Sequence, residues 1–186
     1  MHKAYIFTSD RLGFRNWSME DLDEFAAMNS DPEVMEYFPN LLSRQESADF
    51  IERLQAHFEQ YKYNYFATEI LATGELIGFI GLAFQSYETD FTPAVDIGWR
   101  LKKSAWGNGF ATEGAERCLE YVFIDLNLCK VISTCTEANK KSERLMVKIG
   151  LSKQGNFKHP QLVEHPVYIN CVWYTITRKE WLKQQG

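Results

Sequence analysis

Hydrophobic residues recur along this chain with two spacings, one typical of strands and one typical of helices. Segments in which apolar and polar residues alternate, or in which short apolar runs lie between turn signals, predict strands over residues 6–15, 63–71, 75–84, 96–101, 130–136 and 168–177. Apolar residues three or four positions apart predict helices over residues 18–28, from residue 43 onward, over 109–125 and over 139–149. After an early hairpin, strands and helices alternate. This order predicts an α/β domain with a mixed sheet.

The boundaries of several elements carry their own signals. Ser18 precedes two acidic residues and is a good helix N-cap. Ser43 begins Ser-Arg-Gln-Glu, which matches a capping box with Glu46. Ala72-Thr73-Gly74 separates two strand-like segments and predicts a hairpin. In the predicted helix over 109–125, the apolar face has small side chains near its start, so this end of the helix can pack close to a sheet.

Length and composition limit the class of protein. The 186 residues are 45% hydrophobic and 15% aromatic, which excludes a disordered chain and predicts one domain over residues 1–186. The net charge of −5, without a long basic run, argues against a nucleic-acid partner. The longest apolar stretch, 76–84, is too short to span a membrane. Four scattered cysteines predict reduced thiols, and the histidines lack metal-ligand spacing. We therefore expect a cytoplasmic protein without a metal.

A glycine loop stands between a predicted strand and a predicted helix. It reads Trp106-Gly107-Asn108-Gly109, and backbone N–H groups at such a helix start favour a phosphate-bearing cofactor. Thr112 occupies the place of the third glycine of a dinucleotide fingerprint, and the Walker lysine is missing. A purely structural turn is the alternative interpretation. Taken from the residues, the N–H groups from Gly107 to Ala111 and the Thr112 hydroxyl are the candidate donors.

The loop and four further segments resemble one enzyme family. Trp-Gly-Asn-Gly-Phe-Ala-Thr-Glu is similar to the pyrophosphate loop of the GNAT N-acetyltransferases, in the ribosomal-protein N-terminal acetyltransferase (RimJ/RimL-type) branch. Residues 8–15, 30–35, 139–151 and 174–181 are similar to that branch's first strand, first inter-helix segment, Asn-x-x-Ser helix and closing strand. One position departs from the wider superfamily, because Ser104 stands where Arg or Gln often begins the loop. Lys102, Lys103 and Arg100 are the candidate substitutes.

The resemblance implies a fold and an activity. The fold is a single GNAT-like α+β domain with a mixed, mostly antiparallel central sheet, a splayed parallel strand pair and about four flanking helices. The activity is transfer of an acetyl group from acetyl-CoA to a primary amine, on a protein N-terminus or a small molecule, by direct attack. A homodimer is left open. Two other classes stay open as well: a catalytically silent CoA-binding regulatory module, and a nucleotide-binding α/β enzyme.

The resemblance also assigns residues to the cofactor. The main chain of the strand end would hold the pantetheine arm, the glycine loop the pyrophosphate, and Asn139 the amide arm. The expected cofactor-binding residues are Trp99, Arg100, Leu101, Trp106, Gly107, Asn108, Gly109, Phe110, Ala111, Thr112, Asn139 and Ser142. The alternative for Asn139 and Ser142 is a structural role at the helix N-terminus.

Amine acetylation needs a base, because an alkylamine is mostly protonated at neutral pH. Asp96 is the first candidate: strand alternation puts it on one face with Gly98 and Arg100, and Gly98 leaves space for a ligand. The alternative is that Asp96 pairs with Arg100 or Lys102. Weaker candidates for the base are Glu69, Glu164 and His165. Ser142 is the candidate donor to the departing thiolate.

The acceptor side is only weakly marked. Aromatic residues that would line an amine-accepting cleft, or pack in the core or at its rim, are Trp17, Tyr37, Phe38, Tyr61, Tyr63 and Tyr65. Residues 157–166 hold two His-Pro pairs and predict a loop on that side. We expect this loop to help choose the substrate.

Overall fold

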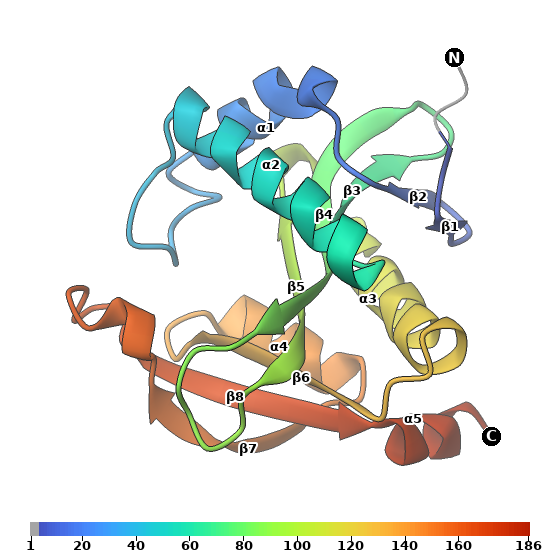
Figure 1. Cartoon of the computed structure of the whole chain (residues 1–186), viewed down its shortest axis with the longest axis vertical. Helices are drawn as coiled ribbons and strands as arrows, with labels where there is room; N and C mark the ends of the chain where they lie inside the picture. Colours follow the sequence, from blue (N-terminus) through green and yellow to red (C-terminus); the bar gives the residue numbers. More distant parts are fainter. Residues whose placement is uncertain (1–3) are drawn as a thin grey trace.

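The computed structural model describes residues 4–186 as an eight-stranded sheet flanked by five α-helices (Figure 1). The strands are β1 (Phe7–Thr8), β2 (Leu12–Arg15), β3 (Tyr65–Ile70), β4 (Glu75–Gln85), β5 (Ala94–Leu101), β6 (Lys130–Thr136), β7 (Ser152–Lys158) and β8 (Asn170–Thr177). The helices are α1 (Leu22–Asn29), α2 (Arg44–Tyr61), α3 (Phe110–Glu120), α4 (Lys140–Lys148) and α5 (Arg178–Gln185). Within residues 4–186, none of these helices has the length and apolar character needed to span a membrane.

The strand order is β1-β2-β3-β4-β5-β6-β8-β7. Each pair of neighbours is antiparallel except β5 and β6, which are parallel. This confirms the mixed, mostly antiparallel sheet with a single parallel pair, and the hairpin over β3 and β4. Five α-helices are present where about four were expected.

The parallel pair is joined over a very short distance. Strand β5 pairs with β4 along residues 94–101, but its register with β6 holds only at Asp96 and Ile132. Just beyond, the Ser133 hydroxyl donates to the Ile97 carbonyl over 2.7 Å. From there the two strands diverge, and the molecule divides into a half with β1–β5, α1 and α2 and a half with β6–β8, α4 and α5 (Figure 1). The divergence leaves the facing edges of 98–101 and 133–136 without a partner strand.

Two hydrophobic clusters hold the sheet. One packs α3 against the sheet, and there a Cβ on Gly114 would lie 2.3 Å from Cδ1 of Ile80. The small residues expected at the start of this helix therefore allow its close approach. The other cluster packs α1 and α2 against β3 and β4, around Phe25 and Ile51.

A buried ion cluster ties the first strands to the rest of the sheet. The Arg15 guanidinium donates to both carboxylate oxygens of Asp21 over 2.7 Å and to Glu69 over 2.5–2.9 Å, and all three side chains are almost fully buried. Glu69 is thus a structural carboxylate outside the cleft described below, so it is not placed to act as a base. The predicted capping boxes at Ser18 and Ser43 are both formed.

Two element predictions need correction. The segment predicted as one strand, 6–15, is two short strands with a turn between them, because Glu113 of α3 accepts hydrogen bonds from Ser9 Oγ (2.7 Å) and Arg11 N (2.8 Å). The last strand, predicted over residues 168–177, is confirmed as β8 and ends at Thr177, which forms a capping box that starts α5, so residues 178–181 of the segment that resembles the closing strand are helical. The helix predicted to Asp125 becomes a π-helical turn after Glu120.

Part of the predicted loop over 157–166 is also strand. The segment β7, which the sequence pattern did not reveal, runs to Lys158 and forms the sheet edge beside β8. Its exposed face is almost entirely polar, so it lacks the apolar alternation on which strand prediction depends.

Candidate active site

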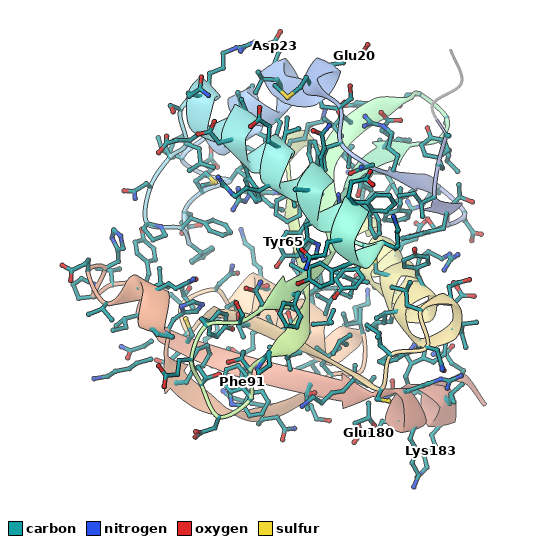
Figure 2. All side chains as sticks on the ribbon, in the orientation of Figure 1. Glu20, Asp23, Tyr65, Phe91, Glu180 and Lys183 are labelled. Atoms are coloured by element: carbon teal, nitrogen blue, oxygen red, sulfur yellow. The ribbon has the colours of Figure 1, made fainter. Side chains whose placement is uncertain are left out.

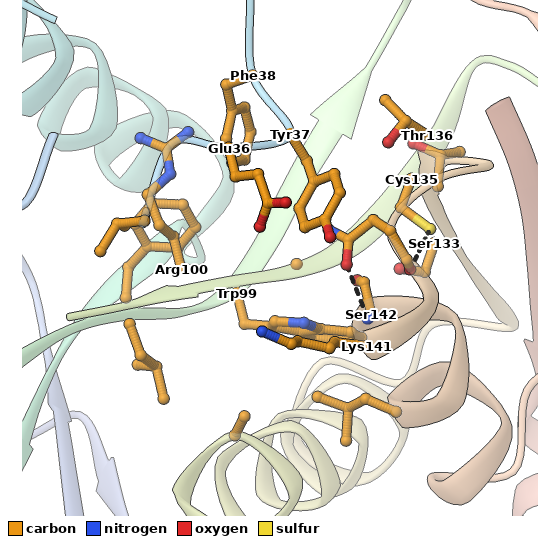
Figure 3. Close-up of a pocket in the computed structure, with 18 of the residues that line it drawn as sticks. Glu36, Tyr37, Phe38, Trp99, Arg100, Ser133, Cys135, Thr136, Lys141 and Ser142 are labelled. Carbon is orange, nitrogen blue, oxygen red and sulfur yellow. Dashed lines mark hydrogen bonds between the residues drawn. The ribbon is translucent and has the colours of Figure 1, made fainter. Parts of the chain in front are cut away.

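The diverging strands open a cleft of about 740 Å³. It runs from the loop over 33–39, past residues 98–101 of β5 and 133–136 of β6, to the glycine loop and the first turns of α3 and α4. Figure 3 shows Arg100 beside Phe38 at one side of this space and Lys141 and Ser142 at the other. The size is typical of a site for a small molecule or cofactor.

The glycine loop presents free backbone donors to this cleft. Gly107 and Gly109 have φ of +77° and +78°, which non-glycine residues rarely adopt, and a Cβ on Gly107 would have no neighbour within 4 Å. The first intrahelical bond of α3 runs from Glu113 N to Gly109 O. In the part of the chain that is described, the N–H groups of 107–112 have no acceptor. A helix N-terminus with several free N–H groups is a ready anion site.

Most of the predicted cofactor residues lie at the cleft. Those that line it are Trp99, Arg100, Leu101, Trp106, Gly107, Gly109, Phe110, Ala111, Thr112, Asn139 and Ser142. Asn108 does not line it: its side chain donates to the Trp106 carbonyl over 3.1 Å, and its own carbonyl accepts from Arg11. Cofactor binding by these residues stays a prediction.

The cations near the loop differ from those expected. Lys102 pairs with Glu75 (2.7 Å), and Lys103 pairs with Glu33 (2.5 Å), so neither serves the loop. The cations that line the cleft near the loop come from α4, and they are Lys141, Arg144 and Lys148. Lys141 Nζ lies 5.1 Å from the centre of the Trp106 ring. Spacing in the sequence did not indicate these residues, because the fold brings α4 against the start of α3.

The first turn of α4 combines two roles. Asn139 Oδ1 accepts a hydrogen bond from Ser142 N over 3.0 Å, so the structural role considered above is present. The cap uses only the carbonyl side of the amide. Within residues 4–186 the Asn139 Nδ2 group has no hydrogen bond, and the side chain lines the cleft. Helix capping and cofactor binding are therefore compatible at this residue.

Asp96 lies where β5 and β6 part, and it is nearly fully buried. Its Oδ2 accepts a hydrogen bond of 2.5 Å from the Tyr65 hydroxyl, and Oδ1 has no partner among residues 4–186. Burial raises the pKa of Asp96 to about 7, although the Tyr65 hydrogen bond acts in the opposite direction. Burial, together with the Asp96 charge, also raises the pKa of Tyr65 well above its usual value.

The structure contradicts one alternative interpretation and one expectation around Asp96. The aspartate does not pair with Arg100 or Lys102: Lys102 binds Glu75, and the Arg100 guanidinium binds Asn29. The space beside Gly98 is not open either, because a Cβ there would lie 3.1–3.3 Å from the Tyr65 ring. Gly98 instead lets that ring reach across the strand to Asp96.

The acceptor-side aromatics divide into two groups. Tyr37, Phe38 and Tyr65 line the cleft. Trp17, Tyr61 and Tyr63 do not, and they pack with other parts of the sheet and helices. From the loop over 157–166, residues His159, Gln161 and Leu162 reach the cleft, whereas Glu164 and His165 do not. Among residues 4–186, no group of three or more acidic, histidine or cysteine side chains is arranged to hold a metal.

The splayed parallel pair of a mixed sheet, with a helix N-terminus that presents free N–H groups beside the split, is the combination to be compared with known families. Residues 11–152 match the family described as "Acetyltransferase (GNAT) domain". The chain belongs to this family, and it is an acetyltransferase.

A curated relative supports the family, and solved structures share the fold. The chain is 30% identical over 176 residues to "Uncharacterized N-acetyltransferase YnaD" of Bacillus subtilis, covering 94% of this chain and 98% of the relative. It is 31% identical over 154 residues to "Uncharacterized protein YkkB" of the same organism, covering 81% and 87%. A GNAT-family acetyltransferase from Bacillus anthracis shares the fold with a TM-score of 0.76 at 24% identity, covering 92% and 98%. Spermidine N-acetyltransferase from Vibrio cholerae, solved with CoA and spermine, shares it with a TM-score of 0.72 at 21% identity, covering 92% and 98%.

Proposed function

We propose that this enzyme transfers an acetyl group from acetyl-CoA to a primary amine by direct attack. The observation that carries the proposal is the continuity of the cleft. It begins at the free N–H groups of the glycine loop, follows the unpaired edges of β5 and β6, and ends beside a buried carboxylate whose pKa lies near neutrality.

The residues present suit the parts of CoA. The N–H groups of 107–112, with the cations of α4 nearby, fit a pyrophosphate. The open edge of 99–101 offers main-chain groups to a pantetheine arm, and Asn139 Nδ2 offers a donor to one of its amides. Acetyl-CoA supplies an activated thioester to this site.

Asp96 is the proposed base. Its pKa of about 7 leaves a large fraction ionised at neutral pH, and Asp96 lines the cleft, so its carboxylate would take a proton from the amine, directly or through water. A main-chain N–H near Gly98 would stabilise the oxygen that gains negative charge, and Ser142 would supply a proton to the thiolate.

The acceptor class within the family is also a proposal. The RimJ/RimL-type motifs favour a protein N-terminus, and a relative that is 26% identical over 113 residues is named "Putative ribosomal N-acetyltransferase YdaF" of Bacillus subtilis. The spermidine acetyltransferase fold favours a small amine equally well. A cytoplasmic location and a homodimer also stay predictions.

The test is release of free thiol from acetyl-CoA over a panel of peptides and small amines. We expect turnover with at least one amine, and a fall in kcat/KM of about 10²–10⁴-fold in Asp96→Asn, the range for loss of a general base. We expect Gly109→Glu to lose CoA affinity, because it adds bulk and negative charge to the anion site. Unchanged rates in both Asp96→Asn and Ser142→Ala would contradict the catalytic assignment.

The same assay distinguishes an active enzyme from the alternative, a regulatory module without turnover. A catalytically silent regulatory module would bind CoA in a calorimetric titration but release no thiol with any amine. Family membership and the raised pKa of Asp96 favour turnover.

A further inference from the structure

Arg100 is a buried cation without an anionic partner among the residues that the structure describes. Its side chain is only 9% exposed, and it lines the cleft beside Phe38 (Figure 3). The guanidinium makes one hydrogen bond, from Nη1 to Asn29 Oδ1 over 2.8 Å. Nε is buried and has no acceptor, and no carboxylate within residues 4–186 comes within 4.0 Å of the group.

Arg100 stays charged in this position. Three aromatic rings surround the guanidinium, with that of Phe38 at 4.0 Å, Phe79 at 5.3 Å and Phe50 at 6.0 Å, and their faces stabilise a cation in part. Burial lowers its pKa, but only to about 10, which is still well above neutral pH. A buried charge normally has a partner of opposite sign, because leaving water is costly. Arg100 has no such partner among residues 4–186, and it lines the cleft.

The position of Arg100 places it on the acceptor side. Figure 3 shows it away from Lys141 and Ser142, which stand where the cofactor is expected. Figure 2 labels Tyr65 in the middle of the molecule, between the two halves. Arg100 follows Asp96 by four residues on the same face of β5, so their Cα atoms lie about 13 Å apart along an extended strand. A substrate that contacts both Asp96 and Arg100 would therefore carry two polar groups, one for each residue, at some distance from each other.

We propose that Arg100 binds a carboxylate of the acceptor, so that the substrates of this enzyme are amines that also bear a carboxylate. The proposal rests on the proposed acetyl transfer. A guanidinium offers five N–H donors in a planar fork that matches a carboxylate, and Asn29 occupies only one nitrogen. Glu36, which points into the same space in Figure 3 and has no ion pair within residues 4–186, offers opposite charge to an ammonium group.

The experiment compares acceptors that differ only in the carboxylate. Each ω-amino acid from glycine to 6-aminohexanoate is paired with the n-alkylamine of equal chain length, and each L-amino acid is paired with its amide. In at least one pair we expect kcat/KM to be roughly 10–100-fold higher for the carboxylated member, the range for a hydrogen-bonded charged group. The amine of an amino-acid amide is less basic than that of the acid. A preference for the acid therefore runs against the amount of free amine.

Two variants test Arg100 itself. Arg100→Gln should reduce the preference to less than about 3-fold, chiefly by raising KM for the carboxylated member. Asn29→Asp should do the same without removing the arginine, because the new carboxylate would pair with Nη1. The control is Arg53→Gln, which removes an exposed guanidinium that lies 5.4 Å from the Phe50 ring and does not line the cleft.

The outcomes separate the two proposals. Turnover with equal rates for both members of every pair, or an equal loss for both members in Arg100→Gln, would overturn the carboxylate site while the acetyltransferase assignment stands. If no amine releases thiol, calorimetric titration of the carboxylated members into CoA-bound protein decides the question. Binding that is lost in Arg100→Gln supports the site, and no binding to the wild-type protein overturns it. Thermal unfolding and CoA affinity of each variant confirm that the fold is intact.

Discussion

Replacing Asp96 by asparagine should make the protein more stable, by an amount that depends on pH. The folded protein holds this carboxyl at a pKa of about 7, above its ordinary value of 3.8, because burial disfavours the charge. Between these values the folded state keeps the proton that the unfolded state releases. Stability therefore falls as pH rises from about 4 to about 7, and this group adds no further change above that.

The size of the effect follows from the two pKa values. The difference between about 7 and 3.8 corresponds to about 4 kcal/mol when the carboxylate is fully ionised, at 1.36 kcal/mol for each pH unit. Asparagine keeps the shape and can still accept from Tyr65, but carries no charge at any pH. The gain in unfolding free energy of Asp96→Asn over the wild type should therefore grow by about 3 kcal/mol between pH 5 and pH 8.

Urea unfolding of both proteins at pH 5, 6, 7 and 8 measures this difference directly. Asp125→Asn is the matched control, because it removes an exposed carboxylate and leaves the buried Asp96 in place. A constant difference for Asp96→Asn, or a variant less stable than the wild type at pH 8, would refute the argument that burial sets the pKa of Asp96.

Three further substitutions test contacts that stabilise the sheet and the helices around the cleft. Gly114→Ala should lower the unfolding free energy by about 1–3 kcal/mol in urea, because its Cβ would overlap Ile80 where α3 crosses the sheet. Arg15→Met should cost about 3–5 kcal/mol in the same assay by removing the cation that both buried carboxylates bind, and neutralising both should recover part of the loss. Ser43→Ala should cost about 1 kcal/mol and lower the thermal midpoint, because the N-cap of α2 is lost, whereas Ser43→Thr should retain most of the stability.

The side of the cleft where we propose that the cofactor binds could be located from sequence, because its signals are local. Gly107 and Gly109 are adjacent to the helix whose N–H groups they expose, and Asn139 caps the helix that it begins. Each motif lies within one turn of the backbone that it shapes. The order of residues along the chain was therefore enough to predict the succession of strand, loop and helix on this side of the cleft.

The opposite side of the cleft, where we propose that the acceptor binds, could not be predicted in detail, because it depends on contacts between distant segments. Arg100 binds Asn29, which is 71 residues away, and Tyr65 reaches Asp96 from another strand. Strand alternation correctly gave the face of Asp96 but not its partner. It also left Gly98 looking open when the Tyr65 ring fills that space. Strand β7 was missed for a related reason: its place at the sheet edge is fixed by pairing with β8 rather than by its own apolar pattern.

The same burial that weakens the fold would strengthen the proposed base. An alkylammonium group has a pKa of about 10.4, so moving its proton to an ordinary aspartate would cost about 9 kcal/mol. With the pKa of Asp96 at about 7, the cost falls to about 5 kcal/mol, which is compatible with turnover on the scale of ordinary enzymes. The stability that folding loses at neutral pH and the basicity that Asp96 gains have one origin, the removal of its carboxylate from water. Asp96→Asn should therefore raise stability and lower activity together, and a variant that did only one of these would separate the two effects.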